Sequence, residues 1–174
     1  MDNASPLFLQ YPEKSPEDIK HKVKELNISD LFNDLNYEQK KQIYLVFKIP
    51  EKIEQDGILI LTQPLSEDGF MSECKKIEIY RNMVLKESGM VFIKPHPRDN
   101  TDYSKILLNN VRVLSKSFPI EILNFMNVKF SKALTVCSGS IYNFSYPIDV
   151  EIQGTELYPE LIKPLGFIKE MKLN

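Results

Sequence analysis

The run Gly57-Ile58-Leu59-Ile60-Leu61-Thr62 is the stretch of this sequence that decides the fold. It is almost continuously apolar, whereas a strand with one face in water alternates between apolar and polar side chains. A loop-like segment with Pro64 and Gly69 follows it directly. The run therefore predicts a strand that is covered on both faces, as in the middle of a parallel sheet.

The chain after this run alternates between helix-like and strand-like segments. An amphipathic pattern predicts a helix over residues 71–88, and Gly89 is suited to end it. Short apolar runs predict strands at 90–93, 111–114, 133–137 and 148–152, with short helices at 104–108 and 119–126 and a further helix starting at 138–140. This is the spacing of βαβ units. We expect an α/β domain with a parallel sheet flanked by helices, from residue 57 to about 153.

The first 50 residues are charged and carry helical patterns instead. Ser15 is a good helix N-cap and Pro16 a good first helical residue, so a helix is predicted from Pro16 to Leu26. One or two further helices are predicted between residues 31 and 47. We divide the chain into a helical N-terminal segment or linker, residues 1–50, and an α/β domain, residues 51–174.

Composition narrows the class of protein. A formal net charge of -2 argues against general nucleic-acid binding, which needs a basic surface. The two cysteines are far apart in the sequence and fit a reducing compartment. The sequence shows neither a bilayer-spanning apolar run nor a signal peptide at its start. We therefore expect a cytoplasmic protein or a fragment of a larger one.

Three loops with unusual residues each follow a predicted strand. They are Glu67-Asp68-Gly69, Lys94-Pro95-His96-Pro97-Arg98-Asp99 and Ser138-Gly139-Ser140. Ligands of an open parallel sheet bind outside the carboxyl ends of the strands, so these loops should meet at one edge. Neither a dinucleotide-binding glycine fingerprint nor a P-loop occurs in the sequence.

Each loop has a chemical role available and a plain structural alternative. His96 is held between two prolines, with the cations of Lys94 and Arg98 beside it, which suits a phosphate or another anion. The Ser-Gly-Ser segment offers hydroxyls and a predicted helix start to the same anion. Asp68 can act as a general base. The alternatives are a proline-rich turn, a helix N-cap and an acidic turn before a helix.

Taken in order, these loops resemble the bacterial sialyltransferases of glycosyltransferase family 52, whose relatives act in lipooligosaccharide and capsule synthesis. The resemblance rests on residues 61–69, 94–99 and 137–140. It implies the Rossmann-like, nucleotide-sugar-binding half of a GT-B glycosyltransferase, which binds the donor CMP-N-acetylneuraminate. It further implies that Asp68 is the catalytic base, and that His96 contacts the departing CMP phosphate and can protonate it.

The resemblance also implies a set of donor-binding residues around these two, namely Gly69, Lys94, Pro97, Arg98, Ser138, Gly139 and Ser140. The reaction it implies is an inverting, metal-independent transfer of sialic acid to a terminal galactose of a bacterial surface glycan, without a cofactor. The expected partners are the donor and a glycan acceptor. We also expect peripheral association with the cytoplasmic face of the inner membrane, and a homodimer would fit this reading.

Three questions stay open at this stage. Either Glu67 or Asp68 can face the site, because a turn can present either side chain. Proteins of this family are about twice as long as this chain, so a non-catalytic nucleotide- or glycan-binding module, or a truncated donor domain, is an alternative. Another cell-envelope transferase with a His-Pro loop is a third reading.

Overall fold

The computed structural model describes residues 5–9, 12–49, 53, 56–106, 108–125 and 128–173. The chain separates into two compact units, Met1–Gln42 and Ile43–Asn174. The division that we drew between a helical segment, residues 1–50, and an α/β domain, residues 51–174, stays a prediction.

The first unit contains a small parallel sheet where a helix was predicted. β1 (Leu7–Leu9) pairs with β2 (Val23–Glu25), and the 3-10 turns η1 (Pro12–Lys14) and η2 (Lys20–Lys22) lie between them. The predicted helix from Pro16 to Leu26 is therefore wrong. A cap signal and a few apolar residues stabilise a short helix only marginally, and strand pairing of the β-branched Val23 overrides them.

The two helices that follow confirm the prediction for residues 31–47. They are α1 (Ile28–Asn33) and α2 (Tyr37–Val46). A capping box begins α2: Gln39 N donates to Asn36 Oδ1 at 3.0 Å, and Asn36 N donates to Gln39 Oε1 at 2.9 Å.

The second unit is built on a six-stranded sheet with the order β5-β4-β3-β6-β7-β8. The strands are β3 (Ile58–Leu61), β4 (Val91–Lys94), β5 (Val111–Val113), β6 (Lys132–Thr135), β7 (Asp149–Ile152) and β8 (Met171–Leu173). Neighbours are parallel except for β8, which runs antiparallel to β7. The predicted parallel α/β fold is confirmed, and β8 adds an edge strand that the sequence did not reveal.

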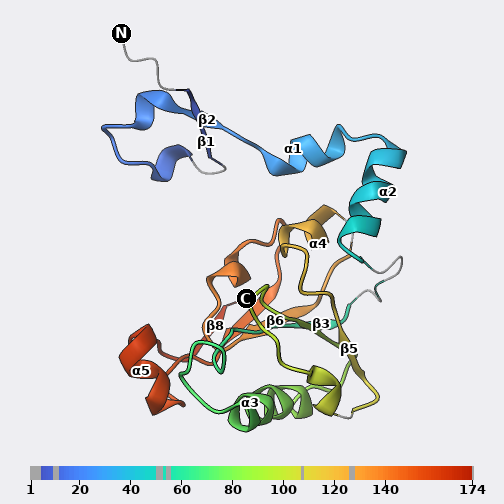
Figure 1. Ribbon diagram of the computed structural model, residues 1–174, viewed down its shortest axis with the longest axis vertical. Helices are drawn as coiled ribbons and strands as arrows, with labels where there is room; N and C mark the ends of the chain where they lie inside the picture. The colour runs from blue at the N-terminus through green and yellow to red at the C-terminus, as the bar shows by residue number, and fades with distance from the viewer. Residues whose placement is uncertain are drawn as a thin grey trace. The chain divides into compact units, whose positions relative to one another are not determined.

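Both faces of the sheet are covered, as the apolar run over β3 predicted. Ile58 and Ile60 pack into one core with α3 (Glu73–Leu85), η3 (Tyr103–Ile106) and α5 (Pro159–Leu165). Leu59 and Leu61 pack into a second core with α4 (Glu121–Phe125). Figure 1 shows α3 and α4 on opposite sides of the sheet. This doubly covered sheet is Rossmann-like.

The predicted helix at 138–140 is only a short 3-10 turn, η4 (Gly139–Tyr142). The predicted helix at 104–108 is likewise the 3-10 turn η3, and Met126, the expected end of the helix at 119–126, lies outside the described residues. No helix in the described part of the chain is both long and apolar enough to span a bilayer.

Candidate functional site

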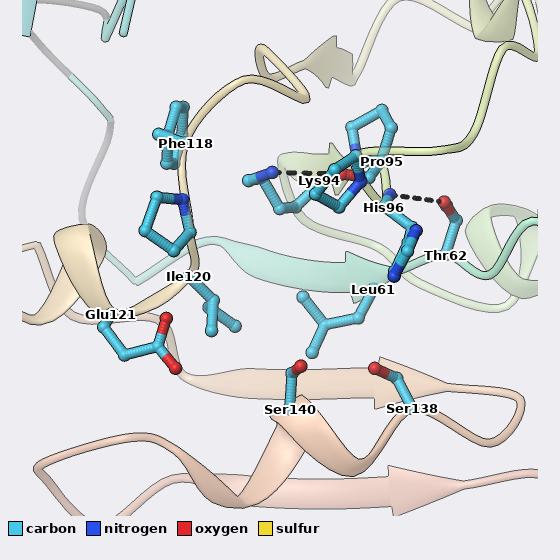
Figure 2. A pocket seen from close by; sticks show the side chains of 12 residues that line it. Leu61, Thr62, Lys94, Pro95, His96, Phe118, Ile120, Glu121, Ser138 and Ser140 are labelled. Atoms are coloured by element: carbon cyan, nitrogen blue, oxygen red, sulfur yellow. Dashed lines mark hydrogen bonds between the residues drawn. The ribbon is translucent and has the colours of Figure 1, made fainter. Parts of the chain in front are cut away.

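A pocket of about 230 Å³ lies at the carboxyl ends of β3, β4 and β6 (Figure 2). The chain leaves β3 toward β4 on one side, and β6 lies on the other side of β3. The pocket therefore lies at the topological switch point, where open α/β sheets bind ligands. Its walls are formed by Leu61, Thr62, Lys94, Pro95, His96, Pro97, Phe118, Pro119, Ile120, Glu121, Ser138 and Ser140.

Residues from two of the three predicted loops meet in this pocket. Lys94, His96 and Pro97 come from the loop after β4, and Ser138 and Ser140 from the segment after β6. The other predicted site residues, Asp68, Gly69, Arg98 and Gly139, are not among its lining residues. The structure thus shows which predicted site residues line the pocket, and the roles of all of them stay predictions.

Lys94 supplies a buried cation to the pocket. The residue is 5% exposed, and its Nζ donates to Pro95 O at 3.0 Å and lies 4.6 Å from the centre of the Phe118 ring. Burial lowers the pKa of Lys94 from 10.5 to about 8, although the nearby Glu121 opposes this. No carboxylate of the described residues forms an ion pair with this ammonium. An anionic ligand would supply that missing partner.

His96 is held by hydrogen bonds in a defined tautomer. Its backbone N donates to Thr62 Oγ1 at 3.3 Å, and its Nδ1 accepts from Arg98 N at 3.1 Å. Because Nδ1 is an acceptor, the neutral ring carries its proton on Nε2. Burial, and then the charge of Arg98, lower the pKa of His96 below its ordinary value. The free ring is therefore a neutral hydrogen-bond donor, and Figure 2 shows it directed toward the side where Ser138 lies.

The two serines contribute hydroxyls rather than a helix N-terminus. Ser138 N donates to Thr135 Oγ1 at 3.0 Å, which ties the segment to the end of β6. The predicted helix start is wrong, because η4 is a single short turn without the aligned peptide dipoles of a helix. The side chains of Ser138 and Ser140 lie on the same side of the pocket, opposite Lys94 (Figure 2). Gly139 borders open space.

Asp68 and Arg98 bind each other beside the pocket. Arg98 Nη1 lies 2.7 Å from Asp68 Oδ1, and Nη2 lies 3.1 Å from Oδ2. This paired geometry links the loop after β3 to the His96 loop. Gly69 adopts φ +74, in the left-handed region that favours glycine, and this turn sets where the Asp68 carboxylate lies.

Glu67 forms hydrogen bonds outside the pocket, and these contacts help to decide whether Glu67 or Asp68 is the better candidate for the base. Its Oε2 accepts from Lys76 Nζ at 2.7 Å, and its Oε1 accepts from Asn100 N at 2.6 Å. Burial raises the pKa of Glu67, but the hydrogen bonds from Lys76 and Asn100 outweigh it and lower that pKa to about 2. A carboxylate with so low a pKa is a weak base, so the geometry argues against Glu67 in that role.

Sequence reasoning missed several residues of this region. Glu121 and Phe118 enter the pocket from the segment between β5 and β6, which carried no motif. Asp99, the last residue of the quoted His96 loop, is buried and paired with Lys76. A signal for Lys76 was present, because it interrupts the apolar face of α3 formed by Ile79, Tyr80 and Met83.

A doubly wound sheet with a pocket at its switch point is the architecture of Rossmann-like ligand-binding domains. The chain matches the family model of glycosyltransferase family 52 over residues 5–161, and it belongs to that family. It is also 38% identical over 173 residues to an uncharacterized protein of Haemophilus influenzae. That alignment covers 96% of this chain and 56% of the relative, so the chain spans little more than half of the relative's length.

Proposed function

We propose that this chain forms the donor site of an inverting sialyltransferase. The reaction would transfer sialic acid from CMP-N-acetylneuraminate to a terminal galactose of a bacterial lipooligosaccharide or capsule. One observation carries the proposal: a buried ammonium, an imidazole N–H and two serines line one pocket at the switch point of the sheet. Membership of glycosyltransferase family 52 supports the same class of reaction.

The pocket offers complementary groups to the two polar parts of a nucleoside monophosphate. Lys94, His96 Nε2–H and the hydroxyls of Ser138 and Ser140 can all donate to phosphate oxygens. The Glu121 carboxylate also lines the pocket, and Asn143 Nδ2 holds it by donating to Oε1 at 2.7 Å. A carboxylate accepts hydrogen bonds from hydroxyls, so Glu121 suits the ribose rather than the phosphate.

In the transfer step, the acceptor hydroxyl oxygen would bond to the anomeric carbon from the face opposite the phosphate. The bond from that carbon to the phosphate oxygen breaks, and its electron pair stays on the departing CMP. Asp68 would take the hydroxyl proton; each of its oxygens keeps a lone pair although both face Arg98. The donors of the pocket would stabilise the charge that develops on the phosphate, with no cofactor or metal ion required.

A second candidate is a donor-binding module that is not catalytic alone. It is favoured by the position of Asp68 outside the pocket walls and by a pocket volume of about 230 Å³. Pockets that enclose a drug-sized ligand usually start at about 300 Å³. The chain also spans only 56% of its relative. In that case, another part of a longer protein or a second copy in a homodimer would complete the site.

Isothermal titration with CMP tests the proposal, and CDP and UDP serve as comparisons. We expect CMP to bind most tightly and His96→Ala to weaken its binding. His21→Ala, at the other histidine of the chain, is the matched control and should bind like the wild type. Absence of CMP binding would overturn the proposal, and a preference for UDP would point to another cell-envelope transferase.

Turnover separates the first candidate from the second. An active enzyme releases CMP from CMP-N-acetylneuraminate in the presence of a lactose-type acceptor, whereas a donor-binding module binds CMP without turnover. We place this activity in the cytoplasm, at the inner face of the inner membrane. Cell fractionation tests this location, and light scattering of the purified protein tests the homodimer.

A further inference from the structure

A fully buried ion pair lies directly behind the His96 loop. Lys76 Nζ lies 2.8 Å from Asp99 Oδ1, and both side chains are 0% exposed. Removing two charges from water costs several kcal/mol per ion, so such a pair is weak evidence of a contribution to stability. Its contacts with the pocket residues point to a different role.

All the acceptor positions of the Asp99 carboxylate are used. Oδ1 accepts from Lys76 Nζ at 2.8 Å and from Thr101 N at 2.9 Å. Oδ2 accepts from Tyr103 OH at 2.8 Å and from the Thr62 hydroxyl. The carboxylate therefore joins α3, the end of β3 and η3 at one point, behind the loop that carries His96.

This arrangement decides the direction of the Thr62 hydroxyl. A threonine hydroxyl has one proton, and here that proton is directed to Asp99. The Thr62 oxygen is left as an acceptor, and it faces His96 N at 3.3 Å. On the other side, Asp99 N donates to His96 O at 2.9 Å. Asp99 thus holds the backbone of His96 at both its N–H and its carbonyl.

The ring of His96 depends on this backbone geometry. Its Nδ1 accepts from Arg98 N, which lies between His96 and Asp99 in the same turn. If the turn loosens, this hydrogen bond is lost and the proton can occupy either ring nitrogen. The Nε2–H donor would then face the pocket for only part of the time.

We propose that Asp99 is a positioning residue for His96. Acting through the Thr62 hydroxyl and through its own amide, it fixes the turn that selects the Nε2–H tautomer, while Lys76 balances its charge. The significance of that tautomer for phosphate binding rests on the proposed function. The positioning itself is a property of the free protein and can be measured without a ligand.

The test is the ¹⁵N NMR spectrum of the histidine rings in wild type and variants. The chain has two histidines, so His21→Ala assigns the His96 signals. We expect the wild type to show one acceptor and one protonated nitrogen, and Thr62→Val to show averaged shifts of mixed tautomers. Thr62→Ser, which keeps the hydroxyl, should restore the wild-type pattern. Thr62→Ala replaces Thr62→Val if the valine variant does not fold.

Tyr103→Phe is the matched control for a merely structural effect. It removes another donor to the same Asp99 oxygen but leaves the contact between Thr62 and His96 in place. We expect it to lower stability without changing the His96 tautomer. A wild-type pattern in Thr62→Val, or mixed tautomers of equal extent in Tyr103→Phe, would overturn the proposal.

CMP titration of the same variants separates this inference from the proposed function. We expect Thr62→Val to bind CMP about two- to threefold more weakly, because the donor tautomer is only partly populated, and Thr62→Ser to restore the wild-type affinity. If the tautomer changes as expected but the wild type does not bind CMP, the proposed function fails and the positioning role stands. If CMP binds and the tautomer is unchanged, the positioning role fails.

Discussion

Replacing Lys94 by methionine should stabilise the free protein while it weakens CMP binding. Burial lowers the pKa of Lys94 from 10.5 to about 8. A tenfold change in an equilibrium corresponds to about 1.4 kcal/mol, so the charged form costs the folded state about 3 kcal/mol. Methionine removes that penalty but also the hydrogen bond to Pro95 O and the contact with Phe118, worth about 1–2 kcal/mol together.

We therefore expect Lys94→Met to raise the free energy of unfolding by about 1–2 kcal/mol near pH 7, which is a few degrees in Tm. The gain should shrink with rising pH. Between about pH 8 and 10.5, Lys94 is deprotonated in the folded state and still protonated in the unfolded state. The unfolded state then binds more protons, so the wild type becomes more stable as pH rises.

Guanidinium unfolding of both proteins at several pH values measures this difference. Lys105→Met, at an exposed lysine of η3, is the control and should change stability by less than about 0.5 kcal/mol. Isothermal titration should show CMP binding weakened by about 10–100-fold in Lys94→Met, the loss of one charged hydrogen bond. A destabilised Lys94→Met with unchanged CMP affinity would refute the reasoning, and so would a gain independent of pH.

Three further predictions concern the other titratable groups. Burial lowers the pKa of His96, so the ring should bind CMP as a neutral donor; titration near pH 7 in buffers of different ionisation enthalpy should show the same proton exchange for the wild type and His96→Gln, and an uptake specific to the wild type would contradict this. Asp68→Asn should abolish sialic acid transfer in a CMP-release assay while changing CMP affinity less than about twofold. Loss of CMP binding in this variant would contradict the role of Asp68 as the base. Glu67→Gln should destabilise the protein by about 1 kcal/mol near pH 7, because the pKa of Glu67 is lowered to about 2 but solvent screens this partly exposed ion pair. That stabilisation is lost as pH falls from about 4.5 to 2. The free energy of unfolding should therefore depend less steeply on pH in the variant over this range. An unchanged pH dependence would count against the Lys76 contact.

The sequence predicted the sheet because its signals there are local. Ile58–Leu61 is apolar without alternation, and so short a run between Gly57 and the loop at Pro64 is typical of a strand buried on both faces. The helix expected from Pro16 to Leu26 failed for the opposite reason. Its cap and spacing were local signals, but the pairing of β2 with β1 depends on residues 16 positions away.

The residues of the candidate site likewise fall into those that local sequence signals predicted and those that only the fold revealed. The motifs around His96 and Ser138 follow strands, and parallel strands end at one edge, so the sequence alone placed these residues together. Glu121 and Phe118 follow β5, and only the strand order brought their segment to the pocket. The sequence also left Glu67 and Asp68 as equal candidates for the base. Two adjacent carboxylates in a turn are told apart by their contacts, and those contacts come from the tertiary structure.

What the sequence by itself determined is therefore the fold class and the edge of the sheet where the candidate pocket lies, because periodicity and strand direction are properties of neighbouring residues. Only the tertiary structure decided how the charges are used. In the part of the chain that the structure describes, no carboxylate forms an ion pair with the buried Lys94, whereas Lys76 is buried against Asp99 and Glu67. Both lysines have apolar neighbours in the sequence. The groups that the fold brings together make one a cation at the wall of a pocket and the other a cation in a buried ion pair.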